Sequence, residues 1–399
     1  MRQTIKQEFV RLFGESKEMK YKAAPGRTNL IGEHVDYQGG YVLPIAINRF
    51  IGAWAKKRGD SWLRFYSLTY RQSYQGDLSC LRYVKEFPWA NYILGVATEL
   101  KKSGILSFGF DLAVGGNVPV ASGLSSSAAL EICVASLLLD LAEVQMEPVE
   151  LIKLARRAEN EFVGVNCGIM DQFSSYLCRK RHALLLNCTT LRYQQVPLSL
   201  GDYTFLLVNT LKERGLLSSA YNQRVAEVNQ ALRVVQKRWP EITYLAELKE
   251  EQLMDFKASM EETIFRRAWH VVRENQRVID SVRYLKAGKI LEFGQLLYAS
   301  HESLKDYYQV SCPELDFIVE FSRNYSGVAG ARLTGGGFGG CCLVLLRKEV
   351  VGDFKETLQA AYQKNFQRQP DFLLVETADG AYYSRNDQVS CEKEESCPS

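Results

Sequence analysis

The stretch that decides the fold is PVASGLSSSAALE, residues 119–131. Gly123 and three successive serines, Ser125, Ser126 and Ser127, stand directly ahead of a run of helix-forming residues, and a strand-like stretch precedes them. This pattern predicts a loop that leads into a helix with Ser125 to Ser127 in its first turn. Backbone N–H groups and the positive end of the helix dipole would face the loop, and small residues would let a phosphate approach closely. The stretch is therefore a candidate phosphate-binding loop, and the alternative is an ordinary serine-capped helix.

Two familiar glycine-rich motifs do not describe this chain. The serine stretch lacks the Gly-Lys-Ser/Thr of a Walker A loop, so the cation that lysine supplies there has to come from elsewhere. A second cluster, LTGGGFGGCCLVLL at 333–346, contains GxGxxG at Gly335, Gly337 and Gly340. A dinucleotide fingerprint opens a helix, whereas CCLVLL is typical of a strand. The cluster therefore predicts a flexible backbone turn that can lie close to a ligand.

A third cluster is APGRTNLIGEHVDYQGGYVLPIAI, residues 24–47. It packs Arg27, Glu33, His34 and Asp36 between two apolar, strand-like runs. Fixed carboxylates in such a loop can tell one hydroxyl from another through hydrogen bonds. The cluster favours a polyhydroxylated ligand, and the alternative is a solvated charged turn.

Two acidic residues stand out in ELIKLARRAENEFVGVNCGIMDQF, residues 150–173. The apolar residues follow helical spacing, and Glu159 borders their buried stripe. Buried carboxylates are uncommon unless they are paired with a cation or a metal, so Glu159 is a candidate magnesium ligand. Asp171, which follows a turn at Gly168, is a candidate general base. The alternative for each is a salt-bridged helix residue.

Size and composition limit the class of protein. With 399 residues, 46% of them hydrophobic, the chain is long enough for two domains. A net charge of +3 is too small to indicate nucleic acid or an anionic membrane as a partner. The N-terminus has no signal-peptide or anchor pattern, and most of the ten cysteines stand in apolar contexts without metal-like spacing. We expect a cytoplasmic protein with reduced thiols and a small-molecule partner.

The order of apolar runs predicts an α+β fold. The strand-like runs GFDLAV, HALLLNC, YTFLLVN and CCLVLLR alternate irregularly with helical stretches. Residues 223–310 have an almost continuous helical pattern, interrupted at Pro240 and Gly288. A composition shift near residue 195 predicts a domain boundary there. The expected division is an N-terminal domain at 1–195, a C-terminal domain at 196–385 and a disordered tail at 386–399.

Taken together, the motifs resemble those of galactokinases, in the GHMP superfamily of small-molecule kinases. The match rests on GRTNLIGEHVDYQGGYVLP, GNVPVASGLSSSAALE and GARLTGGGFGGC, and weaker matches extend it over nearly the whole chain. The resemblance implies a two-domain α+β GHMP kinase fold with the active site between the domains. It also implies phosphorylation of the anomeric hydroxyl of galactose by ATP with Mg²⁺. The oligomeric state stays open, with a monomer favoured.

The resemblance also assigns roles to residues. The catalytic base would be Asp171 and the transition-state cation Arg27. The sugar-binding residues would be Glu33, His34, Val35, Asp36, Gly168 and Tyr221. The ATP-binding loop would be Gly123, Leu124, Ser125, Ser126, Ser127, Ala128 and Ala129. The magnesium ligands would be Ser127 and Glu159. A helix terminus, one metal and one arginine suit phosphoryl transfer, which needs mainly positioning and charge neutralisation.

Departures from the galactokinase pattern leave the sugar open. They are Gln38, Arg214, Ala220 and Val225. Gln38, Val225 and the pair Cys341–Cys342 instead resemble the related galacturonate 1-kinases, whereas Glu33 and Tyr37 follow galactokinase. A further alternative is a non-catalytic sensor of galactose and ATP. Known sensors have a damaged serine loop, and GLSSSAALE is intact here.

Overall fold

The computed structural model describes residues 1–119, 123–165, 167–212 and 217–384. The expected tail at 386–399 and the departure at Arg214 lie outside these residues. Within the described part of the chain, no helix is both long and apolar enough to cross a membrane. The eight cysteines in the described ranges form no disulfides.

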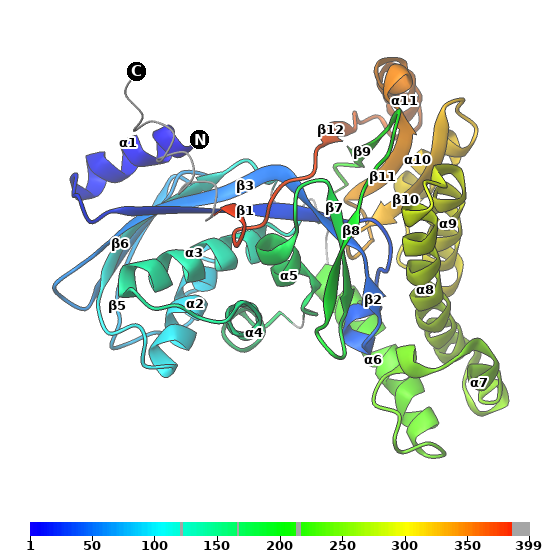
Figure 1. The fold of residues 1–399 in the computed structure, drawn as a ribbon, viewed down its shortest axis with the longest axis horizontal. Helices are drawn as coiled ribbons and strands as arrows, with labels where there is room; N and C mark the ends of the chain where they lie inside the picture. The colour runs from blue at the N-terminus through cyan, green and yellow to red at the C-terminus, as the bar shows by residue number, and fades with distance from the viewer. Residues whose placement is uncertain (120–122, 166, 213–216, 385–399) are drawn as a thin grey trace.

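A five-stranded sheet in the order β1-β3-β6-β4-β5 forms the base of the N-terminal half (Figure 1). Its strands are β1 (Lys20–Asn29), β3 (Pro44–Lys57), β4 (Trp62–Ser67), β5 (Gln72–Asp77) and β6 (Phe110–Gly116). Neighbouring strands are antiparallel except β4 and β6. Helix α3 (Ser126–Ala142) packs on one face with α2 (Ala90–Lys102) beside it, and α1 (Arg2–Phe13) packs on β3 and β6 from the other face.

Burial along β6 shows why this sheet sits inside the domain. Phe110, Leu112 and Val114 belong to the large core on the side of α2 and α3. Ala113, which alternates with them, packs with Ile5 of α1. Because successive side chains of a strand point to opposite faces, a strand covered on both faces has an almost continuous apolar sequence.

The C-terminal half contains a four-stranded antiparallel sheet in the order β10-β11-β9-β12. Its strands are β9 (Tyr203–Asn209), β10 (Val328–Thr334), β11 (Cys341–Arg347) and β12 (Asp371–Val375). The helices around it are α6 (Leu217–Gln236), α8 (Glu262–Lys286), α9 (Ile290–Glu302), α10 (Pro313–Arg323) and α11 (Val351–Phe366). Helices α9 and α10 pack on β10, and α8 packs on α6 and α9. The α+β prediction is confirmed.

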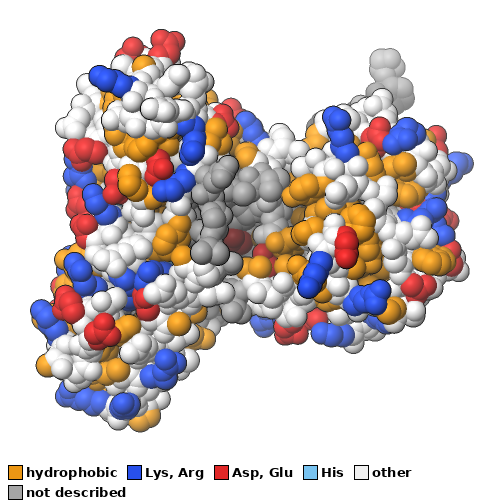
Figure 2. Space-filling view, turned by 180° about the vertical axis from the view of Figure 1, so that it is seen from behind, with side chains coloured by type: hydrophobic (Ala, Val, Ile, Leu, Met, Phe, Trp, Pro, Cys, Tyr) orange, Lys and Arg blue, Asp and Glu red, His pale blue; other side chains and the backbone are white. Residues whose placement is uncertain are grey.

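A small sheet, β2-β7-β8, lies where the two halves meet. Its strands are β2 (Tyr41–Val42), β7 (His182–Asn187) and β8 (Tyr193–Pro197). Residue 195 lies inside β8, so the domain division at 195–196 stays a prediction. Beyond β12, Thr377 pairs with Ile47 of β3, so the chain returns to the N-terminal sheet. Viewed from behind, hydrophobic side chains gather on the N-terminal half beside the hollow between the halves (Figure 2).

The prediction of an almost continuous helical pattern over 223–310 is wrong between α6 and α8. Between α6 and α8, the chain forms only short helical turns and α7 (Glu250–Met254). Pro240, which has no amide hydrogen and restricts the residue before it, follows the end of α6. Gly288, at φ +67°, separates α8 from α9 as predicted. After α9 the helix widens into a π-helical turn at Ser303–Tyr308.

Candidate active site

The serine loop, residues 123–127, ends at the N-terminus of α3. Helix α3 begins at Ser126, and Ser125 is its N-cap in a left-handed conformation with φ 57°. The Ser125 hydroxyl makes no cap hydrogen bond and instead donates to Asp171 Oδ2. The loop therefore differs from the sequence expectation by one residue, since Ser125 lies outside the helix and is directed at a candidate catalytic group.

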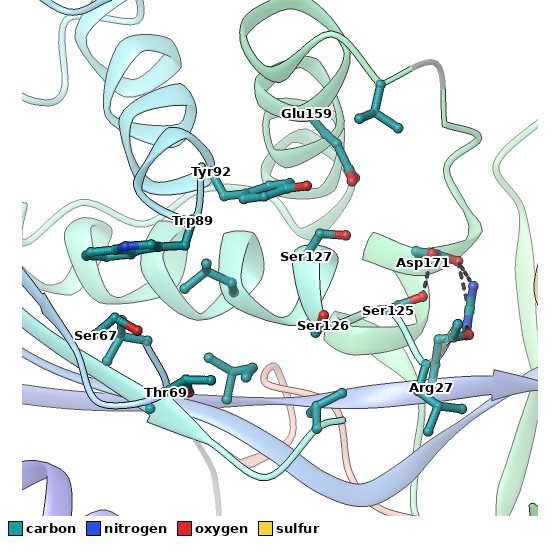
Figure 3. Close-up of a pocket in the computed structure, with 18 of the residues that line it drawn as sticks. Arg27, Ser67, Thr69, Trp89, Tyr92, Ser125, Ser126, Ser127, Glu159 and Asp171 are labelled. Carbon is teal, nitrogen blue, oxygen red and sulfur yellow. Dashed lines mark hydrogen bonds and ion pairs between the residues drawn. The ribbon is translucent and has the colours of Figure 1, made fainter. Parts of the chain in front are cut away.

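A cavity of about 430 Å³ opens at this end of α3 (Figure 3). The serine loop lines one part of it. The part opposite has residues that the sequence analysis missed, namely Ser67, Thr69, Tyr70, Trp89 and Tyr92. The rings of Tyr70 and Trp89 are within 14° of parallel, with centroids 6.4 Å apart. The cavity thus offers flat apolar surfaces at one end and a helix N-terminus at the other. This arrangement suits a nucleobase joined to phosphates.

A second cavity, of about 300 Å³, adjoins the first and contains the polar cluster of the β1–β2 loop. Its lining includes Glu33, His34, Asp36, Gly168 and Tyr221. The residues that line both cavities are Arg27, Glu159, Val165, Asp171 and Gly336. The two cavities therefore meet where the candidate base, cation and metal ligand lie.

Arg27 and Asp171 form the junction. Arg27 Nε and Nη2 lie 2.8 Å and 2.7 Å from Asp171 Oδ1, and Arg27 Nη1 donates to the Gly123 carbonyl at 2.6 Å. Arg27 comes from β1 and Asp171 from the first turn of α5 (Met170–Leu177). Arg27 and Ser125 together hold both carboxylate oxygens of Asp171 in a fixed orientation (Figure 3).

Glu33 lines the second cavity, but its carboxylate already has hydrogen-bond and ion-pair partners within the protein. Its Oε1 accepts from the Gly335 amide at 2.8 Å and lies 3.2 Å from Arg332 Nη2. Its Oε2 accepts from Asn29 at 3.1 Å. Arg332 is fully buried, so Glu33 is a neutralised carboxylate and not an isolated negative charge.

His34 is fixed by a chain of hydrogen bonds. Its Nε2 is 3.2 Å from the Gly336 carbonyl, and its Nδ1 is 2.7 Å from the Tyr37 hydroxyl. Burial lowers the pKa of His34 to about 3, so the ring is neutral. A carbonyl only accepts, so Nε2 carries the proton, Tyr37 donates to Nδ1, and Tyr308 donates to Tyr37 at 2.7 Å. His34 thus links the β1–β2 loop to the glycine turn through hydrogen bonds.

Asp36 is an acid of the second cavity with a raised pKa. Burial raises its pKa to about 7, and the charges of Asp171 and Glu33 add to the effect. Tyr221, from α6, lines the same cavity and also has a raised pKa because of burial. At neutral pH, the Asp36 carboxyl is therefore partly protonated, so it can either accept or donate a hydrogen bond.

Glu159 is carried by a π-helical turn, Ala158–Val163, that continues α4 (Pro148–Arg157). It is 5% exposed, and burial, followed by the charge of Asp171, raises its pKa. The Cys167 thiol and the Gln172 amide, which donate to Glu159, and the nearby Ser127 hydroxyl lower this pKa in turn. Among the described residues, no group of three His, Cys, Asp or Glu is arranged to hold a metal ion.

The glycine cluster is a turn, as predicted. It joins β10 to β11, which pair antiparallel, and no helix follows it. Gly337 has φ +78°, and a Cβ there would lie 2.2 Å from the Val310 carbonyl oxygen. Only glycine fits such a close backbone approach. The turn lets Gly336 reach both cavities.

Three residues of the expected site line neither cavity. These are Val35, Ala128 and Ala129, all fully buried. Gln38 is also buried away from the cavities, and its amide donates to Asn229 of α6 at 2.8 Å. The departure from the galactokinase pattern at Gln38 therefore concerns the packing of the β1–β2 loop and does not alter the lining of the second cavity.

Family models match along the chain. The model described as the galactokinase galactose-binding signature matches residues 7–57, the GHMP kinase N-terminal domain matches residues 91–179, and the GHMP kinase C-terminal domain matches residues 281–364.

Curated relatives and solved structures agree with these matches. The chain is 41% identical to a galactokinase of Bacillus subtilis over 96% of this chain and 98% of the relative. It is 40% identical to a galactokinase of Clostridium tetani over 95% and 96% of the two chains. The structure of Lactococcus lactis galactokinase complexed with galactose superimposes with a TM-score of 0.92 at 38% identity, covering 95% of this chain and 98% of that one. The chain belongs to the galactokinase family of the GHMP kinases.

Proposed function

We propose that the protein transfers the γ-phosphoryl group of ATP to the anomeric hydroxyl of galactose, giving galactose 1-phosphate and ADP. Family membership supports the activity. The observation that carries its assignment to this site is that the two cavities share Arg27 and Asp171. A donor phosphate in the first cavity and an acceptor hydroxyl in the second would therefore meet at those two side chains.

Asp171 is the proposed base and Arg27 the proposed transition-state cation. The acceptor oxygen forms a bond to the γ-phosphorus as the bond from that phosphorus to the bridging oxygen of ADP breaks, and the hydroxyl proton passes to Asp171. Arg27, fixed at 2.8 Å from Asp171, lies where negative charge spreads over the transferred group. The N-terminus of α3 adds backbone N–H donors without a lysine.

The residues present fit a magnesium ion. Glu159 is a nearly buried carboxylate at the junction of the cavities, and Ser127 lines the first of them with it. Hard oxygen donors are the ligands that Mg²⁺ prefers, and it commonly takes one or two from protein and the rest from phosphates and water. We propose that Ser127 and Glu159 hold Mg²⁺, which would neutralise phosphate charge. This small donor set agrees with the absence of a larger metal-binding cluster in the described ranges.

Galactose is the proposed acceptor, and galacturonate is the alternative. Glu33 can accept a hydrogen bond from a sugar hydroxyl and would disfavour a carboxylate. Arg332 weakens that argument because it neutralises Glu33 at 3.2 Å. The sugar-side residues proposed here are Glu33, His34, Asp36, Gly168 and Tyr221, all of which line the second cavity.

A panel of sugars tests the proposal. Galactose, galacturonate, N-acetylgalactosamine, glucose and arabinose are each incubated with ATP and Mg²⁺, and ADP release and acid-labile 1-phosphate are measured. We expect galactose to have the highest kcat/KM. Faster reaction with galacturonate would change the assigned sugar but leave the assignment as a sugar kinase intact. An absence of sugar-dependent ADP release would favour a non-catalytic sensor. A monomeric state, a cytoplasmic location and a lack of nucleic-acid or membrane partners stay predictions.

A further inference from the structure

Neighbouring residues of α5 serve two different parts of the site. Asp171 turns toward Arg27 and Ser125, whereas Gln172 is fully buried and turns toward Glu159. The Gln172 amide Nε2 donates to Glu159 Oε2 at 2.8 Å and to Glu131 Oε2 at 3.1 Å. One amide group therefore bridges two buried carboxyl groups.

The bridge lies behind the cavities and does not line them. Neither Gln172 nor Glu131 lines either cavity, and both are fully buried. Glu131 stands four residues after Ser127 on α3, so the two side chains share one face of that helix. Glu159 thus lines the first cavity together with Ser127 and accepts a hydrogen bond from Gln172 on its interior side.

Few other groups hold the inner oxygen of Glu159. Besides Gln172, Oε2 accepts only from the Cys167 thiol, at 3.3 Å, among the described residues. A thiol is a weak donor, so the amide is the stronger restraint. Oε1 of Glu131 has no partner in the described part of the chain, so the pair of carboxyl groups depends heavily on Gln172.

We propose that Gln172 is a positioning residue that fixes the Glu159 carboxylate for the metal. The role rests on the proposed function, in which Glu159 is a ligand of Mg²⁺. Gln172 directly follows Asp171 in the first turn of α5, so the same helical turn orients the base and the metal ligand. Groups that hydrogen-bond to a metal ligand orient it, and their loss commonly weakens metal binding by about 10- to 100-fold.

The test is a metal titration of Gln172→Met, which keeps the side-chain volume but removes both amide donors. Mn²⁺ replaces Mg²⁺ because it takes the same oxygen ligands and is visible by electron paramagnetic resonance. In the ADP complex, we expect Mn²⁺ affinity to fall by about 10-fold or more. Galactose affinity, measured by calorimetry without nucleotide, should stay within about 2-fold because Gln172 does not line the sugar-sized cavity.

Gln195→Met is the matched control. Gln195 donates its amide to the Leu177 carbonyl, at the opposite end of the same helix, at 2.7 Å. The Gln195→Met substitution should leave Mn²⁺ affinity unchanged. Equal losses of metal affinity in both variants would mean that any loosening of α5 has this effect and would overturn the positioning role. If Gln172→Met does not fold, Gln172→Asn, which keeps the amide but shortens its reach, should weaken Mn²⁺ binding in the same way.

Glu159→Gln separates the two proposals. If Glu159→Gln weakens Mn²⁺ binding but neither Gln172 variant does, Gln172 has no positioning role and the metal assignment stands. If Glu159→Gln leaves Mn²⁺ binding unchanged, Glu159 is not a metal ligand and the role of Gln172 falls with it. Weaker binding in Glu159→Gln and in a Gln172 variant, with the Gln195 control unchanged, supports both.

Discussion

Gly168 packs so closely on Asp36 that a Cβ at Gly168 would lie 1.6 Å from Asp36 Oδ2. A methyl group there has to displace the carboxylate, because two atoms cannot approach to that distance. We expect Gly168→Ala to lower kcat/KM for galactose by about 10- to 100-fold, the usual effect of misplacing a binding group by about 1 Å. The KM for ATP should change much less. Steady-state kinetics with each substrate varied in turn would measure both.

Gly352→Ala is the matched control for that change. Gly352 lies in α11, and a Cβ there meets no atom within 4 Å. It should have native kinetics and equal or slightly higher stability, since alanine favours a helix over glycine. Native galactose kinetics in Gly168→Ala would show that Asp36 is not a sugar-binding group.

Asp171→Asn tests the proposed base. The amide keeps the size of the side chain but cannot take a proton, so we expect turnover to fall by about 100-fold or more while galactose affinity stays within a few-fold. Single-turnover kinetics and calorimetry measure these two quantities separately. Turnover close to native would remove Asp171 from the proton transfer and leave it as a partner of Arg27.

Glu33→Ala tests the basis of sugar selection. Loss of the carboxylate leaves the buried guanidinium of Arg332 without its partner, and a uronate carboxylate could then take that place. We expect the galactose to galacturonate ratio of kcat/KM to fall by about 10-fold or more, which is at least about 1.4 kcal/mol. Thermal unfolding has to show that the variant is folded, and Glu33→Gln is the substitute if it is not. An unchanged ratio would place sugar selection elsewhere.

Asp36→Asn has a predicted signature in the free energy of unfolding. Burial raises the pKa of Asp36 from 3.8 to about 7, so between these values the folded protein keeps a proton that the unfolded chain has lost. The contribution of this group to stability is therefore fully present below pH 3.8 and is lost as the pH rises to about 7. Asparagine has no such loss, so its stability relative to the native protein should rise over that range, by more than about 1 kcal/mol.

Urea unfolding of both proteins at several pH values between 4 and 8, without sugar, measures that difference. Titrating groups that do not interact with Asp36 are common to both proteins and cancel. Parallel pH profiles for the two would mean that the Asp36 carboxyl is not strained by burial.

Sequence motifs predicted residues that line both cavities but missed the aromatic end of the first. Arg27, Asp36 and Asp171 stand in motifs where the residue types themselves indicate chemistry, and the structure brings them to adjoining cavities. Trp89 and Tyr92, three residues apart at the start of α2, share one helix face. That spacing is equally typical of core packing, and nothing local in the sequence distinguishes the two cases.

Other differences arise from long-range contacts. The pairing of Glu33 with Arg332 joins residues 299 positions apart, read from their numbers, and no local pattern indicates it. The π-helical turn at Glu159 has the same apolar spacing as an α-helix in the sequence. Ser125, in its left-handed conformation, donates to Asp171, which folding brings to it from α5.

The sharing of only a few side chains between the two cavities has a consequence for protein engineering. The lining of the second cavity comes largely from the β1–β2 loop, Gly168 and α6, and the lining of the first comes largely from β4, α2, α3 and the serine loop. If the second cavity binds the acceptor as proposed, acceptor scope can be redesigned by substitution around it while the first cavity stays as it is. Arg27, Glu159 and Asp171 are the positions to leave untouched in such a library, because each of them lines both cavities.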